Sequence, residues 1–134
     1  LGTTLVYLDF KSNALESIPV EIGKLYNLVE FDLEDNRLVR LPDTIGDLQS
    51  LALLNVSKNQ LVEFPETLGQ LGKLEVLDCQ SNCLTTFPRS VGGLKKLLML
   101  MSHHNKIRHL PHEIEGMEKL ILFDFSENLI GKTS

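Results

Sequence analysis

Four histidines lie close together in the sequence and raise the question of a zinc site. They are His103, His104, His109 and His112. A protein zinc site needs three or four ligands that converge on one tetrahedral centre. The surrounding pattern predicts His103 on the face of a sheet, His104 at a strand end, and the other two on either side of a proline. Because such positions do not converge, we predict no metal site and no cofactor, and we retain His103 as a candidate for pH-sensitive binding.

No other set of reactive residues suggests catalysis. A nucleophile needs a base within hydrogen-bond reach, and that base needs an orienting group. The sequence pattern brings no serine, histidine and aspartate together in this way, and no cysteine with a histidine. The acidic residues are explained by surface and turn positions. The sequence therefore predicts a protein that is not an enzyme.

Six asparagines recur every 23 residues, and their regularity indicates a structural role. They are Asn13, Asn36, Asn59, Asn82, Asn105 and Asn128. All five prolines also fall on one 23-residue grid. An asparagine amide has both donors and an acceptor, so at a strand end it can bond backbone groups that the turn leaves unpaired. We predict a structural asparagine ladder in a repeat protein.

One unit, residues 28–50, shows which elements carry these positions. Phe31 and Leu33 alternate with acidic residues, which predicts a short half-buried strand. Pro42 is predicted at the first position of a short α or 3₁₀ turn. Gly46 either gives room between successive turns or adopts a positive φ. Stacked units of this kind form an α/β solenoid with a parallel sheet on its concave face and helical turns on its convex face.

The repeat organisation predicts a single domain over residues 1–134. Repeats start near residues 5, 28, 51, 74, 97 and 120, giving about five full repeats and a partial sixth. Solenoids normally need polar terminal caps, and neither end of the sequence resembles one. We therefore expect a fragment of a longer chain, and we expect the uncapped ends to favour self-association.

Composition narrows the classes of partner and compartment. The net charge of −5 argues against nucleic acid as a partner. No apolar run reaches the roughly 18 residues of a membrane span, so no membrane insertion is predicted. The two cysteines are too few for a disulfide framework, which favours a reducing compartment and predicts a cytoplasmic protein. Cys79 falls on a core position and is interpreted as a small buried hydrophobe.

The outward-facing strand positions differ between repeats and are the candidate partner-binding residues. They are Tyr7, Asp9, Lys11, Glu30, Asp32, Glu34, Asp35, Leu53, Asn55, Val76, Asp78, Met99, Met101, His103 and Leu122. Residues 1–67 hold five Lys or Arg against eleven Asp or Glu, which predicts an acidic patch that steers a basic partner. The later repeats predict an exposed apolar stripe. The alternative for the acidic patch is that aspartate is a common residue at this position of the repeat and binds no ligand. The alternative for the apolar stripe is that these are scattered surface residues without a binding role.

The repeated signature LxxLxLxxNxLxxLPxxIGxL, from residue 5 to residue 130, resembles that of the intracellular leucine-rich repeat proteins of the Ras-related group. The resemblance implies a horseshoe that binds another protein on its concave face, often within a larger chain. We therefore predict a protein–protein interaction module whose partner carries basic and apolar residues. The alternatives are a docking or regulatory segment of a larger kinase, phosphatase or GTPase signalling protein, and a structural spacer.

Overall fold

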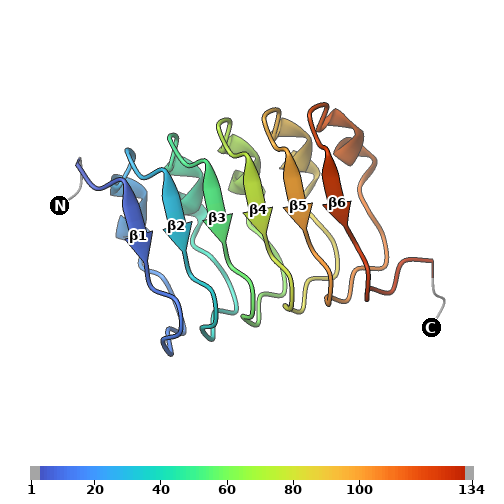
Figure 1. The fold of residues 1–134 in the computed structure, drawn as a ribbon, viewed down its shortest axis with the longest axis horizontal. Coiled ribbons are helices and arrows are strands. Elements are labelled where there is room, and N and C mark those ends of the chain that lie inside the picture. Colours follow the sequence, from blue (N-terminus) through green and yellow to red (C-terminus); the bar gives the residue numbers. More distant parts are fainter. Residues whose placement is uncertain (1–3, 132–134) are drawn as a thin grey trace.

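The structure, a computed structural model, describes residues 4–131, and these form one sheet of six parallel strands. The strands are β1 (Tyr7–Asp9), β2 (Glu30–Asp32), β3 (Leu53–Asn55), β4 (Val76–Asp78), β5 (Met99–Met101) and β6 (Leu122–Asp124). They lie side by side in chain order, with the helical turns behind them (Figure 1). The predicted solenoid is confirmed. Residues 1–3 and 132–134 of the predicted domain lie outside the described residues.

Neighbouring strands pair residues that are 23 positions apart. Tyr7 lies beside Glu30, and Leu54 lies beside Leu77. Hydrogen bonds between neighbouring repeats continue past the strand ends, as in the 2.8 Å bond from the Phe10 N–H to the Asp32 carbonyl. Because one register holds across the sheet, each position of the repeat becomes a line of neighbours spaced about 4.8 Å apart.

Each of the first five repeats returns along the convex side through a 3₁₀ turn, which decides between the two predicted turn types. The turns are η1 (Val20–Lys24), η2 (Asp43–Asp47), η3 (Glu66–Gln70), η4 (Arg89–Gly93) and η5 (His112–Gly116). The prediction for proline is wrong by one residue. Pro42 precedes η2 with an extended ψ of 154°, and its carbonyl accepts the Ile45 N–H at 3.0 Å. The fixed φ of proline suits either position.

The regular spacing of the glycines reflects crowding between successive turns. A Cβ on Gly46 would lie 2.7 Å from the Thr67 carbonyl oxygen, and a Cβ on Gly69 would overlap the backbone of Ser90. Positive φ values of 55° to 60° occur instead at the residue before each asparagine. These residues are Ser12, Asp35, Lys58, Ser81, His104 and Glu127. None is a glycine, so the left-handed backbone at these positions could not be predicted from the residue type.

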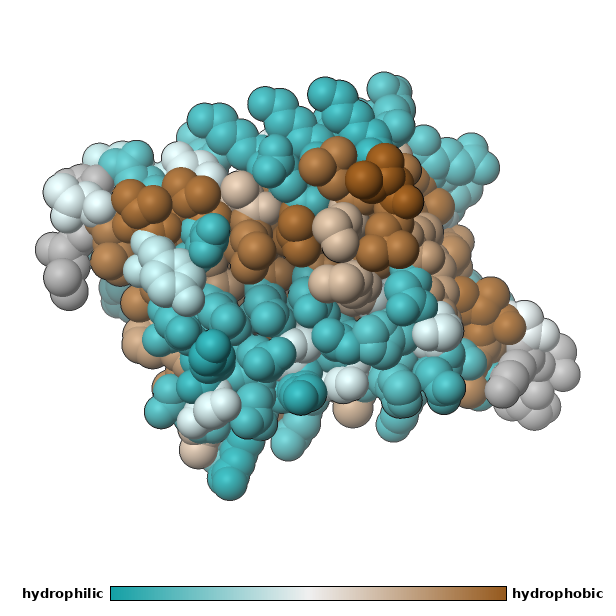
Figure 2. All heavy atoms as spheres, in the orientation of Figure 1, coloured by the Kyte–Doolittle hydropathy of each residue, from teal (hydrophilic) through white to brown (hydrophobic). Residues whose placement is uncertain are grey.

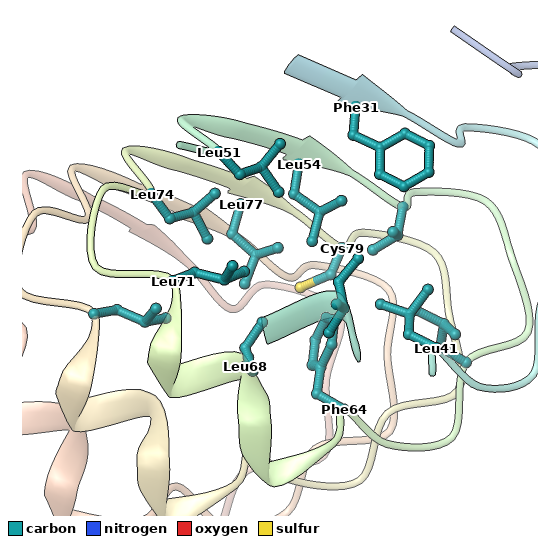
Figure 3. Packing of buried hydrophobic residues seen from close by; sticks show 14 of the residues in the cluster. Phe31, Leu41, Leu51, Leu54, Phe64, Leu68, Leu71, Leu74, Leu77 and Cys79 are labelled. Carbon is teal, nitrogen blue, oxygen red and sulfur yellow. The ribbon is translucent and has the colours of Figure 1, made fainter. Parts of the chain in front are cut away.

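An apolar core fills the space between the sheet and the turns (Figure 3). Leu54 and Leu77 point into it from the strands, and Leu68 faces them from η3. Cys79 is fully buried among them, and this burial raises the pKa of its thiol well above the usual range. The interpretation of Cys79 as a packing residue is confirmed. Ser102, its counterpart one repeat later, is buried too, and its hydroxyl donates to a backbone carbonyl of the sixth repeat at 3.1 Å.

The asparagines link each repeat to the one before it. Asn59 Oδ1 accepts the Leu38 N–H at 2.9 Å. Its Nδ2 lies 2.9 Å from the Leu33 carbonyl oxygen in the preceding repeat and 3.0 Å from the Val56 carbonyl oxygen in its own. The same contacts recur at Asn36, Asn82, Asn105 and Asn128. Asn13 bonds carbonyls of its own repeat.

Candidate partner-binding face

The strands present three columns of side chains on the concave face of the sheet. The first column is Tyr7, Glu30, Leu53, Val76, Met99 and Leu122, and the second is Asp9, Asp32, Asn55, Asp78, Met101 and Asp124. The third, just past the strands, is Lys11, Glu34, Ser57, Gln80, His103 and Ser126. The predicted candidates fall in these columns, except for Asp35. That residue occupies the left-handed turn position just beyond them, with a φ of 60°.

The second column has a backbone role that sequence reasoning missed. Its aspartates and its asparagine each accept a hydrogen bond from the N–H two residues later, as Asp32 does from Glu34 at 3.0 Å. The other bonds of this kind join Asp9 to Lys11, Asn55 to Ser57, Asp78 to Gln80 and Asp124 to Ser126. A short Asp or Asn side chain is suited to this local bond. Part of the acidic character of the face therefore serves the turn that follows the strand.

The acidic patch nevertheless gathers on the first two strands. Asp9 and Asp32 are paired in register, and Glu30 is exposed beside Tyr7. Tyr7 donates its hydroxyl to Asp9 at 3.3 Å. Partial burial and the negative charge of Asp9 raise the pKa of Tyr7. Lys11 Nζ lies 3.9 Å from Asp9, so one lysine partly offsets the charge of the patch.

Asp78 faces outward as predicted, but its side chain is not exposed to a partner. Its exposed fraction is 8%, and the Gln80 side chain covers it with a 3.1 Å hydrogen bond. Burial raises the pKa of Asp78, and the hydrogen bonds from Gln80 oppose that shift. Sequence alternation gave the direction of the side chain correctly. It could not show that the adjacent third-column residue folds back over the carboxylate.

The later strands carry the apolar side of the face. Leu53, Val76 and Met99 are half-buried neighbours in the first column, and Leu122 is 42% exposed beside them. Met101 places an apolar side chain in the second column, where the other repeats have Asp or Asn. Four adjacent strands therefore share one partly exposed apolar surface.

This apolar surface extends further than the alternation predicted. The residue just before each strand is also apolar in most repeats, and these residues are Val6, Val29, Ala52, Leu98 and Ile121. Ile121 is 79% exposed. Together with Leu53, Val76, Met99 and Leu122 they form what we call the apolar band. Figure 2 shows it as brown surface across the N-terminal ends of the strands. The apolar residues before the strands also recur every 23 residues, so the sequence contained this information. The strand alternation did not include them, because it begins at the first residue of each strand.

The opposite side of the face is polar. The second and third columns and the turn beyond them form what we call the acidic band, which appears as teal surface below the brown in Figure 2. Its carboxylates are Asp9, Asp32, Glu34, Asp35, Asp78, Asp124 and Glu127, and its lysines are Lys11 and Lys58. Apolar and acidic character are thus separated across the strands as well as along the solenoid.

The histidines do not assemble into a metal centre. His103 Nδ1 lies 3.3 Å from Asp124 Oδ2. The His104 ring lies edge-on to the His103 ring, with the two ring centroids 5.5 Å apart. His112 contacts Glu113 on the convex side. Within residues 4–131, no group of three His, Cys, Asp or Glu side chains is placed to hold a metal ion. The helical turns of this part of the chain are also too short to cross a membrane.

A parallel sheet with 23-residue register, convex 3₁₀ turns and an asparagine ladder defines a class of repeat solenoid. Residues 3–80 match the leucine-rich repeat region family, and residues 73–94 match the leucine rich repeat itself. The chain belongs to the leucine-rich repeat family. No curated protein gives a significant match to the sequence.

Three solved structures with the same fold are much longer than this chain. A leucine-rich repeat protein of Leptospira interrogans is 37% identical, with a TM-score of 0.91, over 94% of this chain and 32% of its own. Two further structures are PEPR1–AtPEP1, 30% identical with a TM-score of 0.85, and the plant peptide hormone receptor RGFR1 in complex with RGF2, 28% identical with a TM-score of 0.80. The match covers 95% and 90% of this chain, and 19% and 20% of theirs.

Proposed function

We propose that this chain is a protein-interaction module that binds a protein or peptide partner on its concave face and has no catalytic activity of its own. The observation that carries the proposal is the apolar surface shared by β3, β4, β5 and β6, where Leu53, Val76, Met99 and Leu122 are neighbours. Contiguous apolar side chains on a soluble surface mark interaction sites. The acidic patch supplies steering toward a basic partner.

Affinity capture with matched variants tests this role. The chain with Glu30→Lys and Glu34→Lys reverses two charges on the concave face and leaves the Asp32 hydrogen bond in place. Asp43→Lys with Asp47→Lys makes the same charge change on η2. We expect the concave pair to lose partners that the convex pair retains, with both variants folded by circular dichroism. Equal capture by the two variants would contradict binding at the concave face.

A docking or regulatory segment of a larger kinase, phosphatase or GTPase protein is the second candidate. The length of the structural relatives favours it, because the chain spans a third or less of each. Sequencing the complete gene tests it directly, since a catalytic domain in the same reading frame is expected. A structural spacer is the third candidate, and it predicts that concave variants retain every partner.

Three finer features belong to the same proposal. The 23-residue signature supports membership of the Ras-related group and a cytoplasmic location, which fractionation of cells expressing the complete gene would test. Self-association of the isolated 134-residue polypeptide is supported by its first described repeat, where Leu8, Leu15 and Ile22 line an apolar hollow of about 350 Å³. We expect the apparent mass on size exclusion to rise with concentration. A constant monomeric mass would contradict self-association.

A further inference from the structure

The concave face is divided lengthwise, and this division restricts the shape of its partner. The apolar band follows the N-terminal ends of the strands, and the acidic band follows their C-terminal ends (Figure 2). The first column and the third column are four residues apart along a strand, or about 13 Å. A partner must therefore present apolar and basic surfaces side by side along its length.

An α-helix lying across the strands meets this requirement. A helix with its side chains is about 10–12 Å wide, which is close to the separation of the two bands. Its apolar stripe and the residues flanking that stripe can contact one concave surface at the same time. An extended peptide alternates its side chains, so it would turn half of them away from the sheet. Strand addition needs a free sheet edge, whereas this face consists of side chains.

The length of the face sets the length of the helix. Six strands spaced about 4.8 Å apart span about 24 Å, which corresponds to a helix of about 16 residues. The apolar band is interrupted at Glu30 and Glu75, and both residues are exposed. Apart from the covered Asp78, the acidic band bears six carboxylates against two lysines, so the flank of the helix over the strand ends should be rich in Lys or Arg.

We propose that the concave face binds a basic amphipathic helix of about 16 residues that lies across the strands, with its apolar stripe on the apolar band and its basic flank on the acidic band. This inference rests on the proposed function and names the partner class of the same face. The sequence pattern predicted an acidic patch in the early repeats and an apolar stripe in the later ones, whereas here the two kinds of surface run side by side. The physical reason is that the residues before the strands extend the apolar surface across all the repeats.

Three designed peptides test the inference directly. The first is a 16-residue peptide of Leu and Lys with leucines at helical spacing, the second is a scrambled peptide of the same composition, and the third has Glu in place of Lys. Binding to the 134-residue chain is measured by fluorescence anisotropy, and helix formation by circular dichroism. We expect the first peptide to bind about tenfold more tightly than either other peptide and to gain helicity on binding.

Paired variants locate the binding. Met99→Ser with Leu122→Ser removes two neighbours of the apolar band, and we expect about tenfold weaker binding of the first peptide. Val20→Ser with Val39→Ser is the matched control, because these residues are 61% and 43% exposed outside the concave columns. The control pair should change the dissociation constant by less than about twofold.

Several results would overturn the inference. Equal binding of the scrambled peptide would show attraction to charge alone, and binding without helix formation would indicate an extended occupant. If the Met99→Ser and Leu122→Ser variant becomes monomeric where the parent chain is a dimer, the occupant is a second copy of the chain. If none of the three peptides binds while the concave-face variants still lose captured partners, the helical partner is refuted and the proposed binding role stands. Capture indifferent to the face removes the proposed function itself.

Discussion

Replacing Asn59 with alanine is the sharpest test of how the repeats are held together. The carbonyls of Leu33 and Val56 accept from Asn59, and each also accepts from a neighbouring asparagine of the ladder. These carbonyls therefore keep one partner in Asn59→Ala. The Leu38 N–H loses the Asn59 oxygen that accepts it, and Leu38 is fully buried.

The expected cost follows from that one stranded donor. Leaving a buried N–H without an acceptor costs about 1–3 kcal/mol. A domain of ordinary stability has about 5–15 kcal/mol, so the loss should be clear in urea unfolding followed by circular dichroism. We expect the midpoint to fall while the slope of the free energy with urea stays unchanged.

Asn13→Ala is the matched control for the same change of residue. Asn13 is exposed, and its amide donates to the Phe10 carbonyl, which Asn36 also bonds. We expect a cost below about 1 kcal/mol, because no buried group depends on Asn13 for its hydrogen bond. Asn59→Asp provides a second check, since it keeps an acceptor for Leu38 but turns a buried carboxylate toward backbone carbonyls. A cost for Asn13→Ala equal to that of Asn59→Ala, or a neutral Asn59→Asp, would refute this account of the ladder.

Three further predictions concern single positions. Gly69→Ala should destabilise the fold by about 1–3 kcal/mol through overlap with the next turn, whereas Gly72→Ala, whose added Cβ meets no atom within 4 Å, should be neutral or slightly stabilising in the same urea experiment. Asp78→Asn should stabilise the protein at neutral pH, because the pKa of Asp78 is raised in the folded state and the unfolded state therefore loses this proton first. The stability of the parent protein should fall as pH rises from the ordinary aspartate pKa to the raised one. The advantage of the asparagine variant should disappear below that pH range. Cys83 should react with a thiol reagent in the native protein while Cys79 reacts only after unfolding, and equal rates would contradict the burial of Cys79.

The core and the repeat could be predicted from sequence because both depend on local spacing. Phe31 and Leu33 alternate with polar residues, and each repeat buries these residues only against its neighbours. The backbone details could not be predicted in the same way. Asp35 adopts a positive φ without being glycine, and Pro42 lies one residue before its turn. The Asp35 N–H donates to the Ser57 carbonyl of the next repeat at 3.0 Å, a contact that a single repeat does not specify.

The candidate site was predicted in part for a related reason. The first-column residues Leu53 and Met99 were identified because strand alternation points them outward. Ile121 was missed because it precedes its strand, where the period-two alternation no longer predicts which side chains face outward. Asp78 was assigned as a contact, but Gln80 covers it. Exposure depends on what neighbouring side chains do in space, and residue spacing does not record this.

By itself the sequence determined a 23-residue solenoid, its concave sheet and its asparagine ladder, because a strict period leaves each apolar face one place to be buried. The tertiary structure decided the 3₁₀ turns, the crowding at Gly46 and the division of the concave face into an apolar and an acidic band. Those features arise only when repeats are stacked. Crowding between turns, the covering of one side chain by another and the merging of side chains into one surface all depend on which residues are neighbours in space.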